Sequence, residues 1–98
     1  MATTALLDLH VRGDRAADAP AAIEAILGDT RAFEGCLGIE VLVDVEDAAH
    51  LTIVERWESL EHDAAYRAWR STPEGVSGLA DLLDRPSVLV RYETQTAF

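Results

Sequence analysis

Two neighbouring stretches of alternating apolar and polar residues constrain the fold of this chain most strongly. The stretches "CLGIEVLVDV" (36–45) and "HLTIVERWE" (50–58) are rich in β-branched residues and have the period of two that half-buried strands show. Between them, "EDAA" (46–49) is a short polar connection of the kind that joins two hairpin strands. The chain is therefore predicted to contain an antiparallel sheet.

Two more strands are predicted near the ends of the chain. The stretch "TTALLDLHVR" (3–12) alternates in the same way, and Gly13 ends it. The stretch "SVLVRYETQ" (87–95) is the fourth strand, and Pro86 separates it from the preceding residues.

Helical patterns fill the remaining segments. In "DAPAAIEAIL" (18–27), Asp18 is suited to cap a helix and Pro20 to its first turn, and this helix is predicted to end between Gly28 and Gly35. Ser59 is suited to cap a second helix that runs to about Thr72. The apolar spacing in "PEGVSGLADLLD" (73–84) predicts a further short helix.

This order of elements predicts an α+β fold: a ferredoxin-like βαββαβ unit with a four-stranded antiparallel sheet. At 98 residues, the whole chain, 1–98, is expected to form a single domain.

The parity of the strands predicts two different sheet faces. One face would be covered by the helices and form the core: Leu7, Leu9, Ile39, Val41, Val43, Leu51, Ile53, Val88 and Val90. The opposite face has an apolar centre with charged residues around it, as interface patches do. Its central residues are Leu6, Leu42, Val54 and Leu89. We expect a homodimer joined through these sheet faces, the alternative being a solvated face with scattered leucines.

Composition excludes several partners. The net charge is −10, with 18 acidic residues against 8 basic ones, so nucleic acid and anionic membrane surfaces are not expected ligands. No apolar run is long enough to span a membrane, and the start of the sequence lacks the features of a secretory signal. With one cysteine, Cys36, no internal disulfide is possible, so a cytoplasmic location is expected.

Glu55 is the first candidate for chemistry. It has the parity of the core-facing row, as has Trp57, so its carboxylate would lie on an otherwise apolar surface. A buried carboxylate needs a partner. Two interpretations remain open: a structural ion pair with an arginine, or an acid or base at a reaction site.

A row of aromatic and polar residues on the second helix is the other candidate. His62, Tyr66 and Trp69 follow a spacing of i, i+4 and i+7, which places them on one helix face. They could line a pocket for a flat ligand or merely close the edge of the core. The neighbouring stripe of Leu60, Ala64 and Ala68 is expected to do the packing.

The other candidates are weaker. His10 and His50 are each expected to stand alone, and no metal site is predicted. Cys36 has nothing nearby that would activate a thiolate. The common signatures of cofactor binding and of nucleophilic catalysis are absent, so no cofactor is expected.

The sequence resembles that of the antibiotic biosynthesis monooxygenase (ABM) domain family of dimeric α+β barrel proteins. The stretch that carries the resemblance is "TRAFEGCLGIEVLVDVEDAAHLTIVERWESLEHDAAYRAW" (30–69). Within it, the residues that look like the family pattern are Arg31, Gly35, Cys36, Gly38, Glu55, Arg56, Trp57 and Ser59.

The resemblance implies subunits that pair through their sheets and a cavity between sheet and helices in each subunit. Family members include oxygenases that convert anthrone-type aromatics to quinones without metal or flavin, haem-degrading enzymes, and proteins of unknown role. Many members have a histidine nine positions after the tryptophan, where this chain has Tyr66. The chain contains no asparagine, which disfavours the haem-degrading activity that the resemblance would otherwise allow.

Three functions are consistent with these observations. The first is a cofactor-independent monooxygenase acting on an aromatic, polyketide-like substrate. The second is a cyclase or isomerase, and the third is a non-catalytic dimeric binding or accessory protein. Candidate catalytic residues are Tyr66, His62 and Glu55, and candidate substrate-binding residues are Trp57, Trp69, Tyr92 and Arg91, with Arg67 as a second possible arginine.

Overall fold

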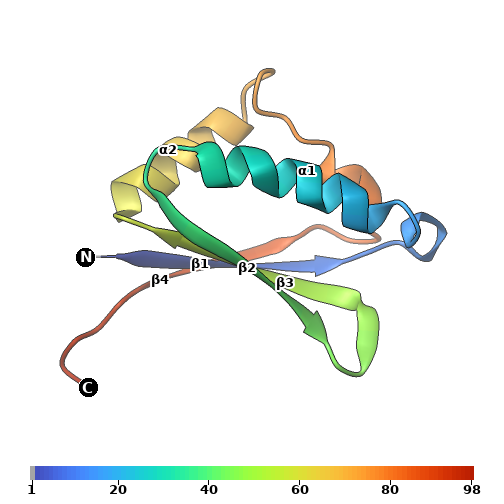
Figure 1. Cartoon of the computed structure of the whole chain (residues 1–98), viewed down its shortest axis with the longest axis horizontal. Coiled ribbons are helices and arrows are strands. Elements are labelled where there is room, and N and C mark those ends of the chain that lie inside the picture. The colour runs from blue at the N-terminus through green and yellow to red at the C-terminus, as the bar shows by residue number, and fades with distance from the viewer. Residues whose placement is uncertain (1) are drawn as a thin grey trace.

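The computed structural model describes residues 2–98 and contains one four-stranded antiparallel sheet. The strands are β1 (Thr3–His10), β2 (Cys36–Asp44), β3 (Asp47–Trp57) and β4 (Val88–Glu93), in the spatial order β2-β3-β1-β4. Both helices, α1 (Ala19–Ala32) and α2 (Leu60–Arg70), lie over the same face of the sheet (Figure 1). The predicted α+β, ferredoxin-like fold is confirmed.

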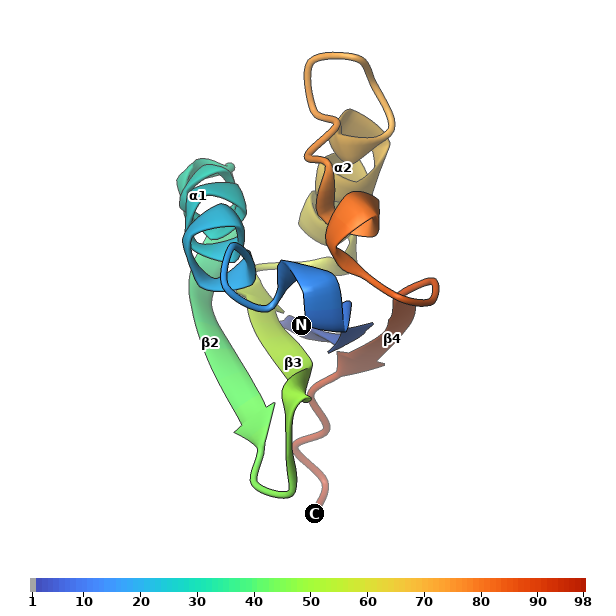
Figure 2. The ribbon, with the colours of Figure 1, turned by 90° about the vertical axis from the view of Figure 1, so that its right-hand side faces the viewer.

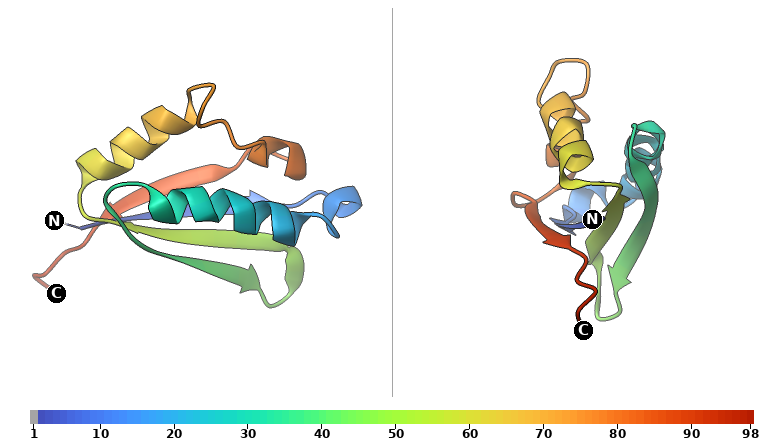
Figure 3. Two further views of the ribbon diagram at one scale, coloured as in Figure 1. Left: turned by 45° about the horizontal axis from the view of Figure 1, so that its top comes forward. Right: turned by 90° about the vertical axis from the view of Figure 1, so that its left-hand side faces the viewer.

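The second sheet face carries no helix. In Figure 2, α1 stands above the β2 side of the sheet and α2 above the β4 side, and no helix of residues 2–98 lies below the sheet. Two short 3-10 helices, η1 (Gly13–Arg15) and η2 (Leu79–Leu82), lie in the connections. Figure 3 shows that the residues after β4 lead away from the sheet. Within residues 2–98, no helix has the length and the apolar character needed to cross a membrane.

The two helix starts follow the sequence signals to different degrees. The Ser59 hydroxyl accepts a hydrogen bond from the backbone N–H of His62 at 3.2 Å, so the predicted cap of α2 is confirmed. Asp18 precedes α1, but its side chain makes no capping bond. It instead accepts a hydrogen bond from Arg15 at 3.3 Å.

Buried residues form two clusters beneath the helices. The larger one joins α1 to the centre of the sheet and includes Leu9, Ile23, Leu27 and Ile53. The smaller one, which we call the aromatic cluster, consists of Phe33, Trp57, Tyr66 and Trp69, and packs against Ala5. Hydrophobic packing thus fixes α1 mainly through aliphatic residues and α2 through aromatic ones.

The packing face of α2 differs from the predicted one. Leu60, which is 41% exposed, and the two alanines at 64 and 68 face outward. Asp63 and Tyr66 are buried instead. Asp63 can be buried beside the aromatic cluster because arginines from α2 itself and from β4 pair with its carboxylate, which offsets the cost of burying the charge.

The predicted parity of β4 is wrong. Residues directly opposite each other in an antiparallel pair share a face. Leu89 lies opposite Leu7 on the helix-covered face, whereas Val90 lies opposite Leu6 on the open face. Leu89 therefore does not belong to the open-face patch, and Val88 and Val90 do not belong to the core row. The run Val-Leu-Val is apolar in both parities, so alternation alone could not choose between them.

The predicted helix over 73–84 is also wrong in extent, since only Leu79–Leu82 form a 3-10 turn. The backbone N–H of Gly75 bonds back to Thr72, and Gly78 adopts a positive φ of 75° just before the turn. A positive φ is incompatible with a continuous right-handed helix. The segment before η2 is therefore an irregular loop.

The hairpin end of the sheet is less covered than predicted. The β2–β3 turn occupies Val45 and Glu46, so β3 begins earlier than the sequence pattern suggested. Figure 1 shows this hairpin bending away from α1. As a result Val41 and Val43, assigned to the core by parity, are 41% and 52% exposed.

Candidate functional site

A cavity of about 470 Å³ lies between the sheet and the two helices. Side chains of β1 and β3 form its floor, α1 and α2 form its walls, and the loop before η2 borders it. Most of its wall is aliphatic: Leu7, Leu9, Ile23, Leu27, Ile53 and Leu79. The polar side chains at the α2 side are Thr30, Glu55, Tyr66, Arg67 and Arg70. An apolar pocket with a few convergent polar groups is the usual form of a small-molecule site.

Glu55 is the only acidic residue that β3 contributes to this cavity, and it is 2% exposed. Its Oε1 accepts a hydrogen bond from Nη2 of Arg67 at 2.5 Å and one from Nε1 of Trp57 at 3.2 Å. Both contacts are to the same oxygen, which leaves Oε2 without a protein partner among residues 2–98. The structure thus contains the arginine pair of the first interpretation, and because Glu55 also lines the cavity, a role of its other oxygen in a reaction stays a hypothesis.

A second buried carboxylate extends this ion-pair network. Asp63, with no exposed side-chain surface, accepts a hydrogen bond from Nη2 of Arg67 at 2.9 Å and one from Nη1 of Arg91 at 3.1 Å. The network thus joins β3, α2 and β4 and contains two carboxylates and two guanidiniums. Equal numbers of opposite charges make its burial tolerable, because each charge has a partner.

Tyr66 places a phenol hydroxyl at the cavity, beside Thr30 and Arg70. Its hydroxyl lies 2.6 Å from Oγ1 of Thr30 and accepts a hydrogen bond from Nε of Arg70 at 2.7 Å. Because the Thr30 hydroxyl donates to the carbonyl of Ile26, the Tyr66 hydroxyl donates to Thr30. The guanidinium groups of Arg67 and Arg70 also lie about 5.0 Å and 5.2 Å from the centre of the Tyr66 ring.

The two tryptophans predicted to bind substrate lie behind this wall rather than in it. Trp57 is fully buried, with its ring centre 4.9 Å from that of Tyr66. The Trp69 ring lies at a tilt of 38° to the rings of both Phe33 and Tyr66, and the Arg70 guanidinium lies over it, 4.8 Å from its centre. Their observed contacts orient Tyr66 and Glu55, and neither ring borders the cavity.

Three further predicted site residues lie away from the cavity. His62 sits at the start of α2, where its Nδ1 lies 2.7 Å from the Ser59 hydroxyl. Its ring fills the space beside Gly35, where a Cβ would collide with it and where φ is 90°. Arg91 is held by Asp63. Tyr92 lies opposite Thr4 in the β1–β4 pair, so it is on the open face of the sheet.

The ambiguous alternation of β4 explains why Tyr92 was predicted on the wrong face of the sheet.

The sequence pattern did not identify Arg70 or Thr30 as site residues, although both contact the Tyr66 hydroxyl. Arg70 could have been found, because it follows Tyr66 by four positions on the same helix and so lies on the same face. Thr30 gave no such signal, since its contact with α2 depends on how the two helices are placed.

Cys36 lies at the edge of the aromatic cluster and is half-buried. Burial raises the pKa of its thiol, and the nearby negative charge of Glu55 acts in the same direction, against the hydrogen bond from the backbone of Gly38. A raised pKa keeps the thiol protonated and unreactive, in keeping with a structural residue.

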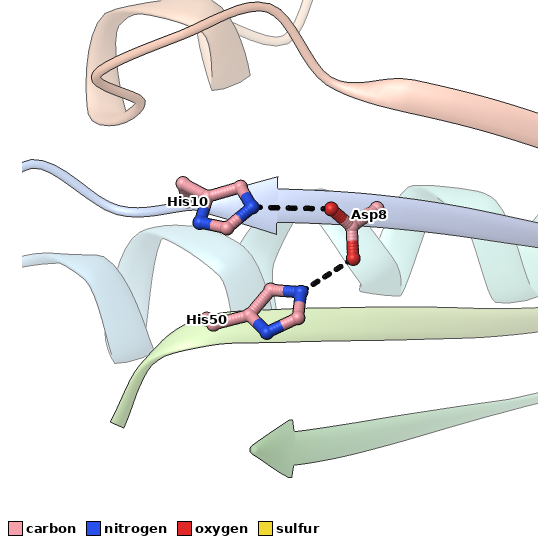
Figure 4. Close-up of side chains that lie close together, drawn as sticks. All are labelled: Asp8, His10 and His50. Atoms are coloured by element: carbon pink, nitrogen blue, oxygen red, sulfur yellow. Dashed lines mark hydrogen bonds and ion pairs between the residues drawn. The ribbon is translucent and has the colours of Figure 1, made fainter. Parts of the chain in front are cut away.

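The prediction that His10 and His50 stand alone is wrong. They are directly opposite in the β1–β3 pair on the open face, and their rings stack with centres 4.4 Å apart (Figure 4). Hydrogen bonds to Asp44 and Asp8 raise the pKa of His50, and the His50 hydrogen bond correspondingly lowers the pKa of Asp8. This cluster is separated from the cavity by the sheet.

The sequence matches one protein family. The family model described as antibiotic biosynthesis monooxygenase matches residues 3–75, which include β1, both helices and the β2–β3 hairpin. No curated protein matches the sequence.

Several solved structures resemble this fold over nearly the whole chain. The protein Rv0793 from Mycobacterium tuberculosis is 19% identical, with a TM-score of 0.79 and coverage of 97% of this chain and 96% of that one. A conserved protein from Methanosarcina mazei Go1 is 18% identical, with a TM-score of 0.82 and coverage of 97% and 94%. PA3566 from Pseudomonas aeruginosa is 19% identical, with a TM-score of 0.75 and coverage of 97% and 95%. At these identities the likeness establishes the shared fold.

Proposed function

The chain belongs to the antibiotic biosynthesis monooxygenase family, and on that basis we propose that it is a small monooxygenase that oxidises an aromatic, anthrone- or phenol-type substrate with O₂. The observation that carries the proposal is the cavity of about 470 Å³. Its wall is mostly aliphatic, and at one side it holds the Glu55 carboxylate, with one oxygen unpartnered among residues 2–98, and the Tyr66 phenol. Such a site suits a flat apolar ring that carries an ionisable oxygen.

The proposed reaction begins with loss of a proton from the activated carbon of the substrate. The resulting carbanion passes one electron to O₂, and the two radicals combine to form a peroxide at that carbon. Protonation of the peroxide and loss of water leave a carbonyl. The carbon thus loses two hydrogens, one oxygen atom of O₂ enters the product, and the other leaves as water. The reducing electrons come from the substrate, so no cofactor is required.

Glu55 is the proposed proton acceptor. Arg67 and Trp57 fix its Oε1, so the carboxylate cannot rotate freely, while Oε2 has no protein partner among the described residues. A general base must lie within hydrogen-bond reach of the proton that it removes, and a residue on the cavity floor meets that condition for a ring lying above β3.

Tyr66 and Arg70 are proposed to stabilise the substrate oxyanion. The Arg70 guanidinium donates to the Tyr66 hydroxyl, which makes that hydroxyl a stronger donor. A substrate oxygen beside Tyr66 would receive the hydrogen bond that Thr30 accepts in this structure. A donor already positioned for developing negative charge lowers the barrier without reorganisation.

The direct test measures oxidation of anthrone by tag-free, chelator-treated protein in air-saturated buffer. We expect quinone formation above the buffer rate, a loss of roughly 10²-fold or more in Glu55→Gln, and a loss of roughly 10²-fold in Tyr66→Phe. Matched controls are Glu74→Gln, an exposed glutamate, and Tyr92→Phe on the open face, and both should retain wild-type activity. Wild-type protein with no activity above buffer would contradict the proposal.

The alternatives predict different outcomes of the same experiment. A cyclase or isomerase would turn over its substrate equally well under argon, because proton transfer needs no O₂. A binding or accessory protein would bind the aromatic compound without converting it. The cavity exceeds the roughly 300 Å³ that small-molecule sites require, which favours a ligand-binding protein over one with a solid core.

The homodimer is proposed through the open face, with a revised patch. Leu6, Val54 and Val90 lie in register across three strands of this face, and Leu42 lies on the same face of β2, opposite Thr52. Val88 and Tyr92 on β4 enlarge the apolar area and are more than half exposed. A two-fold axis through this patch would bury it against its own copy.

A further inference from the structure

A cluster of two histidines and two aspartates on the open face does not take part in the proposed reaction. His10 and His50 come from β1 and β3, the two central strands of the sheet, and are directly opposite in the ladder. Asp8 lies two residues before His10 and therefore on the same face. Figure 4 shows the Asp8 carboxylate beside both imidazole rings, with a dashed line to each.

The distances bring three potential metal ligands together. Nε2 of His10 lies 3.2 Å from one oxygen of Asp8, and Nε2 of His50 lies 2.6 Å from the other. The ligand atoms of the three residues all lie within 4.8 Å of one another. Ligands of a tetrahedral zinc ion bound at about 2.0–2.1 Å are separated by about 3.3 Å. Side-chain rotations that turn the stacked rings toward a common point would bring these atoms to the separation that an ion needs.

A fourth residue holds one of these ligands in the required orientation. Nδ1 of His50 lies 2.8 Å from Oδ2 of Asp44, and an imidazole that donates Nδ1–H to this carboxylate presents Nε2 toward Asp8. Metal-binding histidines usually have such a carboxylate partner on the nitrogen that does not bind the metal. Thr52 also donates a hydrogen bond to Asp8, with its hydroxyl 3.4 Å from Oδ1, the oxygen that His50 contacts.

We propose that Asp8, His10 and His50 form a binding site for a single divalent transition-metal ion, of which Zn²⁺ is the representative. Two imidazole nitrogens and one carboxylate oxygen are a ligand set that zinc accepts, and a water molecule would complete a tetrahedron. In the unpaired chain the three side chains are between 26% and 36% exposed, so an ion can reach them from solvent before two chains pair through this face. The net charge of −10 favours the approach of a cation.

The role of this ion would be structural. The sheet separates the cluster from the cavity, so an ion there cannot contact a bound substrate. It would instead cross-link β1 to β3 at the end of the ladder. Because the ligands come together only in the folded chain, binding would stabilise the fold and raise the thermal unfolding midpoint.

The test uses tag-free protein freed of metal with a chelator. Co²⁺ titration is expected to produce the visible absorption of a four-coordinate site, which Zn²⁺ should abolish by displacement, and calorimetry with ZnCl₂ should give one ion per chain. His10→Ala, His50→Ala and Asp8→Asn should each weaken Zn²⁺ binding by at least about tenfold, and Asp44→Asn by about 10- to 100-fold. Circular dichroism without metal verifies that the variants are folded.

His62→Ala is the matched control. His62 is the third histidine of the chain, and its Nε2 lies 3.7 Å from Glu58 and 3.9 Å from Glu34, so it is the alternative place for weak metal binding. This variant should bind Zn²⁺ as the wild type does. Any one of three results would overturn the proposal. These are no Zn²⁺ binding at concentrations on the order of 100 micromolar, binding that is insensitive to His10→Ala and His50→Ala, and a stoichiometry of one ion per two chains.

Discussion

The hydroxyl of Tyr66 lies 2.6 Å from the hydroxyl of Thr30, and this hydrogen bond joins the centre of α2 to the end of α1. The Arg70 guanidinium joins this pair, because it donates hydrogen bonds to both hydroxyls and to the carbonyl of Ile26. The two helices therefore meet through polar groups at the α2 side of the cavity. Removing any one of these groups leaves buried donors or acceptors without partners.

Tyr66→Phe should therefore lower the free energy of unfolding by about 1–2 kcal/mol, because Arg70 and Thr30 lose a buried hydrogen-bond partner. Urea denaturation monitored by circular dichroism measures this change. The matched substitution Tyr92→Phe removes a hydroxyl on the open face and should change the value by less than about 0.5 kcal/mol. Equal effects of the two substitutions would contradict the assigned role of Tyr66.

Asp63→Ala should be among the most destabilising single substitutions in α2. It removes a fully buried carboxylate and leaves Arg67 and Arg91 without their shared partner. Breaking a buried ion pair costs about 3–5 kcal/mol, and the partial exposure of both arginines places the expected loss near the lower end. Chemical denaturation gives the value.

The exposed pair between Arg56 and Glu40 provides the comparison for that result. Glu40→Ala should change the free energy of unfolding by no more than about 1 kcal/mol, since solvent screens this pair. If Asp63→Ala proved as mild as Glu40→Ala, the ion-pair network would not be what fixes α2 to the sheet.

Leu42→Asp should convert the proposed dimer into a monomer or prevent folding. The two-fold axis would bring two carboxylates into an apolar interface, where neither could keep its charge at low cost. Val90→Asp should act in the same way, because Val90 lies on the open face. Light scattering at tens of micromolar protein should give twice the 10.7 kDa chain mass for the wild type.

Asp47→Ala in the hairpin is the control for these substitutions, and it should keep the wild-type mass. A wild-type mass of 10.7 kDa at that concentration would exclude the proposed dimer.

Cys36 should react slowly with iodoacetamide in the folded protein. The pKa of its thiol lies above the ordinary value of 9.0, mainly because burial disfavours the thiolate, and only the thiolate reacts. At pH 8 we expect alkylation several-fold slower than in urea-unfolded protein, measured by mass spectrometry. Comparable rates in the two states would show that the thiol is not shielded.

The same shift gives a direction for stability against pH. Between the unfolded and the folded pKa of Cys36, the unfolded chain has lost the proton that the folded chain retains, so stability falls as pH rises. The contribution is complete below the unfolded pKa and is lost as pH rises through the folded pKa. Cys36→Ala should remove this part of the pH dependence.

The sequence by itself determined the elements of the fold whose causes are local. Alternation predicted the strands, and the β2–β3 hairpin follows from a short polar connection between two such stretches. The cap of α2 depends on Ser59 and the residues directly after it, so it too could be read from the sequence. Glu55 was correctly predicted to be buried, because the nearest residues of the same parity in β3 are apolar and face the core.

Only the tertiary structure decided which surfaces meet. The run of apolar residues in β4 is compatible with either parity, and pairing with β1 placed Leu89 over the cavity side and Tyr92 on the open face. Helix α2 has a plausible apolar stripe, yet it buries Asp63 and Tyr66, because Arg91 and Thr30 approach from distant parts of the chain. Strand register likewise brings His10 beside His50. These contacts join residues far apart in sequence, and their free energy depends on partners that no local pattern specifies.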